Sequence, residues 1–532
     1  MAADSHSLAA RPPGMREWPS SWAAALTTSL LLFLASPGTF SFSPLAWVAL
    51  IPLLWAVNNC SVKKAALLGL LSGLLYYLPL LHWIITVLAT FGQVPLPLAI
   101  LALILLAAYM SCYLALFTGL CRLVAPKIPL LCSAPFFWVA LDFVRSKLFT
   151  GFPWLDLGYS QYDAPGLIQV ADLVGHHGVS FLIVTANVLL MLGAAAVYQK
   201  KIAQPRTMGA ALLLLIAAAG YNLHQLRTIP SLLAQAEKFR VAVVQANIPQ
   251  DQKWLAASQK QTVESYLELS RLALAQNGAT DLIVWPETAL PFYPQEHALS
   301  LLLQTGLAHP HQVAILTGAP HRERAAATAP IRYYNSAFLV SPDGRMGERY
   351  DKQHLVPFGE YIPFRQLLAF ASPVVETMGD FSPGAFHKPL SCQNSRIGVL
   401  ICFESIFPEL SREQVSKGAN LLVIITNDAW FGRTSAPYQH LAMAVFRAVE
   451  NRRSVARAAN TGISGFIEPS GQLQAASPLF KPYTAGRKMP LLGLTTFYVD
   501  KGYLFPYLCL LLTASCLLWR ILTGKPEPKN NV

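Results

Sequence analysis

Eight apolar stretches constrain the fold of this chain more than any other feature of its sequence. Most are close to the roughly 20 residues that a membrane-spanning helix needs. They cover residues 22–40, 44–57, 65–90, 96–120, 129–144, 178–198 (beginning near 167), 207–223 and 502–522. In the third, Gly69 and Gly73 have the spacing of a helix-packing notch. Only 13% of the residues are charged, about half the share in soluble domains. The sequence therefore predicts a membrane α-helical bundle of eight spans.

Basic residues in the short loops indicate the orientation of the spans. They occur as Lys63 and Lys64; Arg122 and Lys127; Lys200, Lys201 and Arg206; and Arg520, Lys525 and Lys529. The intervening loops at 38–43 and 89–96 have none, and only Arg145 and Lys147 break the alternation. Basic loops stay in the cytoplasm, so both termini are expected there.

The orientation divides the chain into three parts. We expect a membrane domain with seven helices (1–225), a long segment outside the cytoplasmic membrane (226–500), and an eighth helix with a cytoplasmic tail (501–532). The net charge of +12 follows from the cytoplasmic loops. Without a basic patch interleaved with aromatic residues, it predicts no nucleic-acid partner.

The segment 226–500 has the pattern of an α/β domain. Short β-branched runs predict strands at 239–246, 281–285, 313–317, 336–340, 397–402, 421–426 and 464–467. Helical periodicity predicts helices at 261–276, 297–307 and 437–447. Strands that alternate with helices indicate a sheet with helices packed on it.

Cys402 stands at the end of one predicted strand, Ile397 to Ile401, where ligands of α/β sheets usually bind. A helix that starts at Phe403 would favour a thiolate there. The alternative is a structural cysteine, since free cysteines are often buried. Cys392 is the other cysteine of this segment. A bridge between the two would mask the thiol, and two cysteines are too few for a disulfide framework.

Other predicted strand ends and turns carry further polar residues that could take part in acid–base chemistry. Glu287 follows a buried strand and Pro286, Lys352 precedes a second carboxylate at Glu360, and Asn427 follows a further strand. Taken singly, Glu287 and Lys352 could be solvated surface residues. His354 is interpreted as structural, and because no metal-binding spacing is present we predict no metal and no cofactor.

Together these motifs resemble one family. Trp285-Pro-Glu287, the stretch 351–361 (DKQHLVPFGEY), Ile401-Cys-Phe-Glu404 and the stretch 427–432 (NDAWFG) resemble the Glu-Lys-Cys motifs of the nitrilase superfamily. With seven spans before the domain and one after it, the chain resembles the apolipoprotein N-acyltransferase family. The stretches 150–159 and 247–254 add to the match.

The resemblance implies an αββα sandwich and specific roles. Glu287 would be the general base, Lys352 would stabilise the oxyanion, and Cys402 would be the nucleophile. Glu360 would be an auxiliary carboxylate, and a backbone N–H near Phe403 would support the oxyanion. Three aromatic residues would lie near the acyl chain or on lids: Trp254, Phe358 and Trp430.

The implied reaction takes an acyl chain from a phospholipid, by analogy phosphatidylethanolamine, and passes it through a thioester to the amine of a diacylglyceryl-cysteine on an apolipoprotein. The protein would lie in the inner membrane with its catalytic domain in the periplasm. The closest alternative is a membrane-tethered amidase that uses the same triad and water. A transporter is a further alternative, for which buried charges in the spans would argue; the candidates are His82, Asp142, Asp172, His176 and His177.

Overall fold

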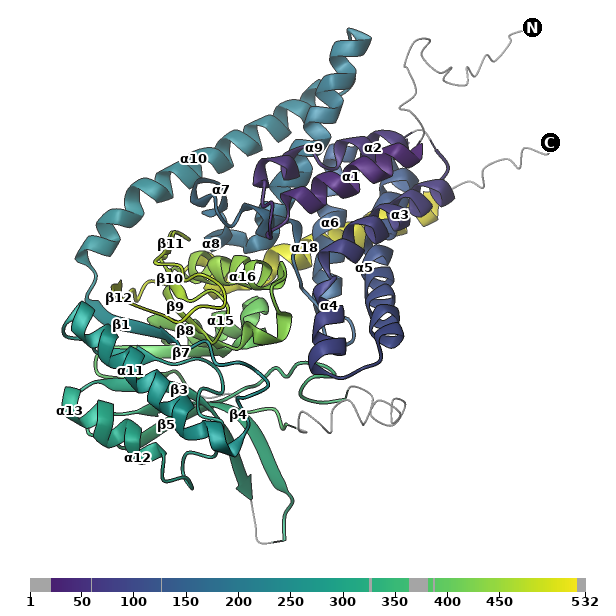
Figure 1. Ribbon diagram of the computed structural model, residues 1–532. Helices are drawn as coiled ribbons and strands as arrows, with labels where there is room; N and C mark the ends of the chain where they lie inside the picture. The colour runs from purple at the N-terminus through teal and green to yellow at the C-terminus, as the bar shows by residue number, and fades with distance from the viewer. Residues whose placement is uncertain are drawn as a thin grey trace, which may run out of the picture.

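The computed structural model describes residues 21–58, 60–125, 127–324, 328–362, 381–385 and 388–523 (Figure 1). The tail expected at 524–532 lies outside the described residues. Figure 1 shows the apolar helices gathered at one end of the molecule and the two sheets at the other, with α15 and α16 between them.

Four helices in the described part of the chain are long and apolar enough to cross a membrane. They are α5 (Leu96–Val124), α9 (His176–Gln199), α10 (Pro205–Gln235) and α18 (Leu504–Thr523). A fifth candidate is α3 (Val62–Leu80) together with α4 (Trp83–Ile85) and the π-helical turn Thr86–Phe91, bent by 50°. Pro79 lies in the last turn of α3, where a proline is a common cause of such a bend.

The remaining predicted spans fold as shorter helices. These are α1 (Ser21–Ala35), α2 (Ile51–Asn58) and α6 (Ala134–Lys147). The first ends before Pro37-Gly38, and α6 contains Asp142, Arg145 and Lys147. Eight membrane crossings therefore remain a prediction. The structure agrees with the coarser expectation of a membrane protein with several apolar helices.

The predicted notch in the third apolar stretch is confirmed by the packing of α3 on α5. A Cβ on Gly69 would lie 2.5 Å from the carbonyl oxygen of Leu114, and one on Gly73 would lie 2.7 Å from Cα of Ser111. Only glycine permits these approaches, so the two backbones meet closely.

The polar segment contains two six-stranded sheets. The first has the order β12-β1-β2-β3-β4-β5 and the second β11-β10-β9-β8-β7-β6. The first consists of β1 (Lys238–Gln245), β2 (Leu282–Val284), β3 (Ala314–Arg324), β4 (Ile331–Val340), β5 (Met346–Asp351) and β12 (Tyr483–Pro490). The second consists of β6 (Leu390–Cys392), β7 (Ser395–Ile401), β8 (Leu421–Thr426), β9 (Ser454–Ala459), β10 (Gly465–Ile467) and β11 (Leu473–Gln474). The strands β1, β2 and β3 run parallel, as do β7, β8 and β9.

Three apolar layers hold these sheets in place. One core lies between the sheets, and a second lies between the first sheet and helices α11 (Gln259–Asn277) and α12 (Ser300–Leu303). A third joins the second sheet and helices α15 (Pro408–Ser416) and α16 (Ala436–Asn451) to the membrane helices. The result is an αββα sandwich whose outer layer, α15 and α16, packs directly on the membrane part.

Polar contacts fix this junction as well. The side-chain oxygen of Gln439 on α16 accepts hydrogen bonds from the indoles of Trp83 (3.1 Å) and Trp154 (2.8 Å). Arg452, after α16, forms a buried ion pair of 2.7 Å with Asp172 in the short helix α8 (Ala171–Val174). Because these partners come from both parts, the sandwich has a fixed position on the helices.

Candidate active site

Four strands from the two sheets end at one place. Glu287 follows β2, Lys352 follows β5, Cys402 follows β7 and Asn427 follows β8. The Lys352 ammonium lies 3.5 Å from Oε1 of Glu287, and the backbone N–H of Asn427 donates to Oε2 of Glu287 at 2.9 Å. The Cys402 thiol interacts electrostatically with both Glu287 and Lys352. The structure thus brings together the three residues that the sequence predicted as a Glu-Lys-Cys group.

The turn that presents Glu287 depends on a glycine in the neighbouring strand. Gly318 in β3 donates its N–H to the Pro286 carbonyl at 3.1 Å. A Cβ there would lie 2.6 Å from Cα of Glu287 and 2.5 Å from the nitrogen of Thr288. Both distances are too short for any side chain, so glycine is required for the carboxylate to reach its position.

Lys352 is held between two carboxylates. Its Nζ donates to Oε1 of Glu360 at 2.9 Å, closer than to Glu287. Asn335 of β4 links the same carboxylates, since its Nδ2 lies 2.7 Å from Glu287 and 3.0 Å from Glu360. Burial acts to lower the pKa of Lys352, but Glu360 and Glu287 outweigh it and hold the pKa above its ordinary value. The ammonium therefore remains charged at any working pH.

Cys402 occupies a constrained backbone position. Its φ is +52°, a conformation that costs a non-glycine residue about 1–3 kcal/mol and that clusters at functional sites. Its carbonyl accepts a hydrogen bond from the hydroxyl of Ser405 at 2.9 Å and lies 3.1 Å from Nε2 of the buried His440. These contacts hold the turn, which leads into the 3-10 helix Cys402–Ile406, a short form of the helix that the sequence predicted from Phe403.

The electrostatic surroundings keep the thiol protonated at rest. Burial raises the pKa of Cys402, the charges of Glu287 and Asp428 act in the same direction, and Lys352 opposes them. A thiol in this state needs a base before it can attack. Glu287 is the carboxylate with a direct electrostatic effect on the thiol and a contact with Lys352, which fits the role of that base.

Glu404 is a structural residue of the site to which sequence reasoning assigned no role. Its carboxylate accepts hydrogen bonds from the backbone N–H groups of Ile401 (2.7 Å), Gln353 (2.6 Å) and His354 (3.2 Å), and from the Tyr350 hydroxyl (2.9 Å). Burial raises its pKa to about 7, and the backbone donors act the other way. This one side chain ties the segment after Lys352 to the strand before Cys402. Its place two residues after the thiol was the available signal.

The aromatic residues expected near an acyl chain differ in their surroundings. Trp254 is 49% exposed and Phe358 is 42% exposed. Trp430 packs edge-on against Phe91, in the bent segment after α3, with ring centroids 5.4 Å apart. Phe403 is buried and packs against Phe407 at 5.2 Å. Trp254 and Phe358 are thus open to solvent, whereas Trp430 contacts the bent segment after α3.

His354 also belongs to this aromatic packing. Its ring lies 3.8 Å from that of Phe407, centroid to centroid, and its backbone N–H binds Glu404. Both contacts agree with the structural role that the sequence suggested.

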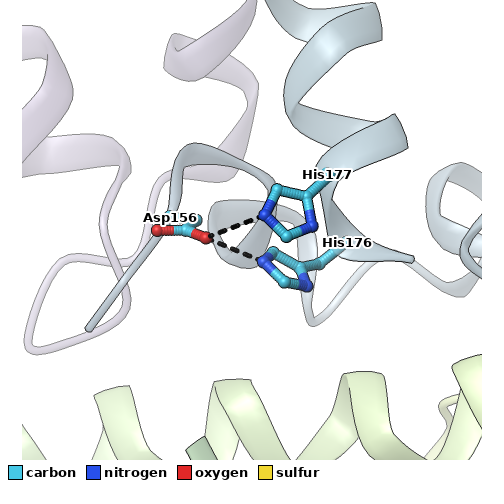
Figure 2. A group of neighbouring side chains, drawn as sticks. All are labelled: Asp156, His176 and His177. Atoms are coloured by element: carbon cyan, nitrogen blue, oxygen red, sulfur yellow. Dashed lines mark hydrogen bonds and ion pairs between the residues drawn. The ribbon is translucent and has the colours of Figure 1, made fainter. Parts of the chain in front are cut away.

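One group in the described residues has the composition of a metal site. Figure 2 shows an oxygen of Asp156 directed at the rings of His176 and His177. That oxygen lies 2.7 Å from Nε2 of His176, and the other oxygen pairs with Arg145. Nδ1 of His176 lies 3.2 Å from Oε1 of Glu450 on α16. Because protein cations already match the carboxylate, we interpret the group as an ion-pair network between the helices and the sandwich.

The same pairing accounts for other buried charges of the helical part. Asp142 pairs with Arg145 at 3.2 Å, and Asp172 with Arg452. Charges matched in this way have a structural explanation that requires no transported ion.

Two family models match the chain. Residues 28–189 match the apolipoprotein N-acyltransferase N-terminal domain, and residues 240–486 match the carbon-nitrogen hydrolase family. The latter covers the sandwich with all the strand ends described above. This chain also resembles the crystal structure of Saccharomyces cerevisiae Nit3, a member of branch 10 of the nitrilase superfamily. That likeness has 18% identity and a TM-score of 0.37, and covers 56% of this chain and 97% of Nit3.

Curated relatives match nearly the whole length. An apolipoprotein N-acyltransferase from Geobacter metallireducens is 43% identical, covering 91% of this chain and 92% of its own. One from Methylococcus capsulatus is 34% identical, covering 89% and 91%. The helical part and the sandwich of this chain thus both match, in the same order, proteins that carry the same name. The chain belongs to the apolipoprotein N-acyltransferase family.

Proposed function

We propose that this protein transfers a fatty acyl chain from a phospholipid, through a thioester on Cys402, to the N-terminal amine of the diacylglyceryl-cysteine of apolipoproteins. The family assignment supports the class of enzyme, an acyltransferase that N-acylates lipoproteins. The observation that carries the mechanism is the thiol of Cys402 beside the carboxylate of Glu287 and the ammonium of Lys352.

In the first step Glu287 takes the thiol proton as the sulfur of Cys402 attacks the ester carbonyl carbon. The oxyanion that forms is stabilised by the Lys352 ammonium and by the backbone N–H of Phe403. The C–O bond then breaks, and Glu287 returns the proton to the leaving oxygen. The products are a thioester on Cys402 and a lysophospholipid.

In the second step the α-amine of the lipoprotein cysteine attacks the thioester carbon. Glu287 accepts a proton from the amine, the C–S bond breaks, and the proton restores the thiol of Cys402. An amide is the product. Glu360, bound to the Lys352 ammonium, orients that ammonium in both steps. Covalent catalysis in two half-reactions predicts ping-pong kinetics.

A catalytic domain attached to membrane helices suits these lipid substrates. Bringing an acyl chain into water costs about 0.8 kcal/mol for each CH₂, so a site held at the bilayer avoids a large penalty. We propose eight spans within 1–225 and 501–532, an inner-membrane location, and a catalytic domain (226–500) on the periplasmic side. Phosphatidylethanolamine is the proposed donor. Trp254, Phe358 and Trp430 would contact the acyl chain and keep water from the thioester.

The rival function is that of a membrane-tethered amidase, in which water is the second nucleophile. Incubation of the purified protein with labelled phospholipid separates the two. We expect an acyl mass on the peptide that contains Cys402, and its transfer to a diacylated lipopeptide rather than release as free fatty acid. Cys402→Ser should remove the thioester, while Cys392→Ser, at a buried thiol of β6, should retain it. Acylation that survives Cys402→Ser would overturn the proposal.

A further inference from the structure

A second buried lysine lies at the active site and has no part in the mechanism above. Lys253 is 0% exposed. Its Nζ donates to the backbone carbonyl of Glu287 at 3.1 Å, and it interacts electrostatically with the Glu287 carboxylate and the Cys402 thiol. Among the described residues, no carboxylate lies within ion-pair distance of Lys253. An ammonium buried without a paired anion is costly, so its position calls for an explanation.

The loop that carries Lys253 is fixed against the active site. Asn460 binds this loop at two points, through its carbonyl to the N–H of Asn247 (3.0 Å) and through its side chain to the N–H of Ile248 (3.0 Å). Gln250 accepts a hydrogen bond of 2.7 Å from the side chain of Asn427, whose N–H binds Glu287. The loop is therefore tied to Asn460 and, through Asn427, to the Glu287 carboxylate, and the ammonium is held in the protein interior.

The charge balance of the site shows what a second ammonium would do. Glu287 and Glu360 carry two negative charges against the one positive charge of Lys352. Nearby, Asp428 is matched by Arg457 at 2.8 Å. Proton transfer from Cys402 to Glu287 keeps this net charge of −1 and moves it to the sulfur, and attack on the ester then moves it to the oxyanion. With Lys253 protonated, two carboxylates face two ammonium groups, and the fixed charges sum to zero.

We propose that Lys253 is a second active-site cation, whose ammonium stabilises the negative charge that passes from the Glu287 carboxylate to the Cys402 sulfur and then to the oxyanion. Its ionic partner is then created by the reaction itself. This explains a buried lysine that has only a carbonyl as its hydrogen-bond acceptor in the described resting site. The inference rests on the proposed role of Cys402 as the nucleophile.

The surroundings of Lys253 give the proposal a pH signature. Burial lowers its pKa from 10.5 to about 7, although Glu287, from the turn after β2, and Cys402, from the end of β7, act in the opposite direction. On its own loop Asp251 is exposed. Lys253 is therefore charged below about pH 7, and its support for the thiolate is lost as the pH rises above that value.

The test measures the thiol directly. In the full-length protein, the rate of Cys402 alkylation by iodoacetamide is followed against pH by mass spectrometry of the Cys402 peptide. Lys253→Met should slow alkylation at neutral pH about tenfold, which is a rise of about one unit in the apparent thiol pKa. Lys260→Met removes an exposed lysine of α11 and should leave the profile unchanged. A native profile in Lys253→Met would overturn the proposal.

Lys253→Arg separates a charge effect from a proton-acceptor role. A guanidinium stays protonated, so the alkaline decline of acyl transfer from phosphatidylethanolamine vesicles should move to higher pH. If the arginine variant equals the methionine variant in alkylation and in acyl transfer at every pH, the cation role is wrong. Alkylation needs no phospholipid. Normal alkylation without any acyl-enzyme would therefore refute the proposed function and leave the inference on Lys253 intact.

Discussion

Replacing Lys352 by methionine tests the centre of the site, because two carboxylates share this ammonium. At an effective dielectric constant of about 20, charges 2.9 Å and 3.5 Å apart attract by about 6 and about 5 kcal/mol. Desolvation offsets most of this, and removal of one partner from a buried ion pair typically costs about 3–5 kcal/mol. We expect Lys352→Met to lose about that much stability, since Glu287 and Glu360 would face each other.

The same change should also slow chemistry. Loss of one oxyanion donor lowers the rate by about 10²–10³-fold, so acyl-enzyme formation on Cys402 should fall at least that far. Denaturant unfolding measures the first effect and mass spectrometry of the Cys402 peptide the second. The double variant Lys352→Met with Glu360→Gln removes the carboxylate repulsion. It should recover much of the stability and none of the activity. Native stability in the single variant, or recovered acylation in the double variant, would refute the reasoning.

Three further changes test the supports of the site. Gly318→Ala should slow acyl-enzyme formation on the thiol more than about tenfold, since the new methyl group would lie 2.6 Å from Cα of Glu287 and displace the base; an unchanged rate would show that the turn can shift freely. Glu404→Gln should lower the free energy of unfolding by about 2–3 kcal/mol, measured by denaturant titration, because an amide NH₂ would face backbone donors; equal stability would contradict this. Asp172→Asn leaves the buried Arg452 without its anion and should speed amide hydrogen exchange in α8 and α16, while unchanged exchange would show that this ion pair does not hold the junction.

The sequence pointed to Glu287, Cys402 and Asn427 as candidate site residues because each follows a strongly apolar strand. Lys352 follows the polar strand β5 and was singled out by its motif instead. Buried runs such as Ile397 to Ile401 can be recognised from composition alone, and the residue at the end of such a strand has a defined position. For the same reason the apolar stretches and the notch at Gly69 and Gly73 could be read directly. These are local properties of neighbouring residues in the chain.

Strands with mixed polar sequences escaped recognition. The edge strands β5 and β12 lack an apolar pattern, and β9 contains Arg457 in its centre. This arginine is buried because it pairs with Asp428 at 2.8 Å. Asp428 follows a different strand, so the residues next to Arg457 in the sequence do not indicate this ion pair.

The sequence by itself determined the candidate residues of the site and that the chain belongs in a membrane. Only the tertiary structure decided that Asn335 bridges two carboxylates, that Glu404 ties two strand ends together, and that Lys253 lies buried beside Glu287. The physical reason is that burial and ion pairing depend on distances across the sheets. Those distances are set by strand order and packing, which residues far apart in the chain fix jointly.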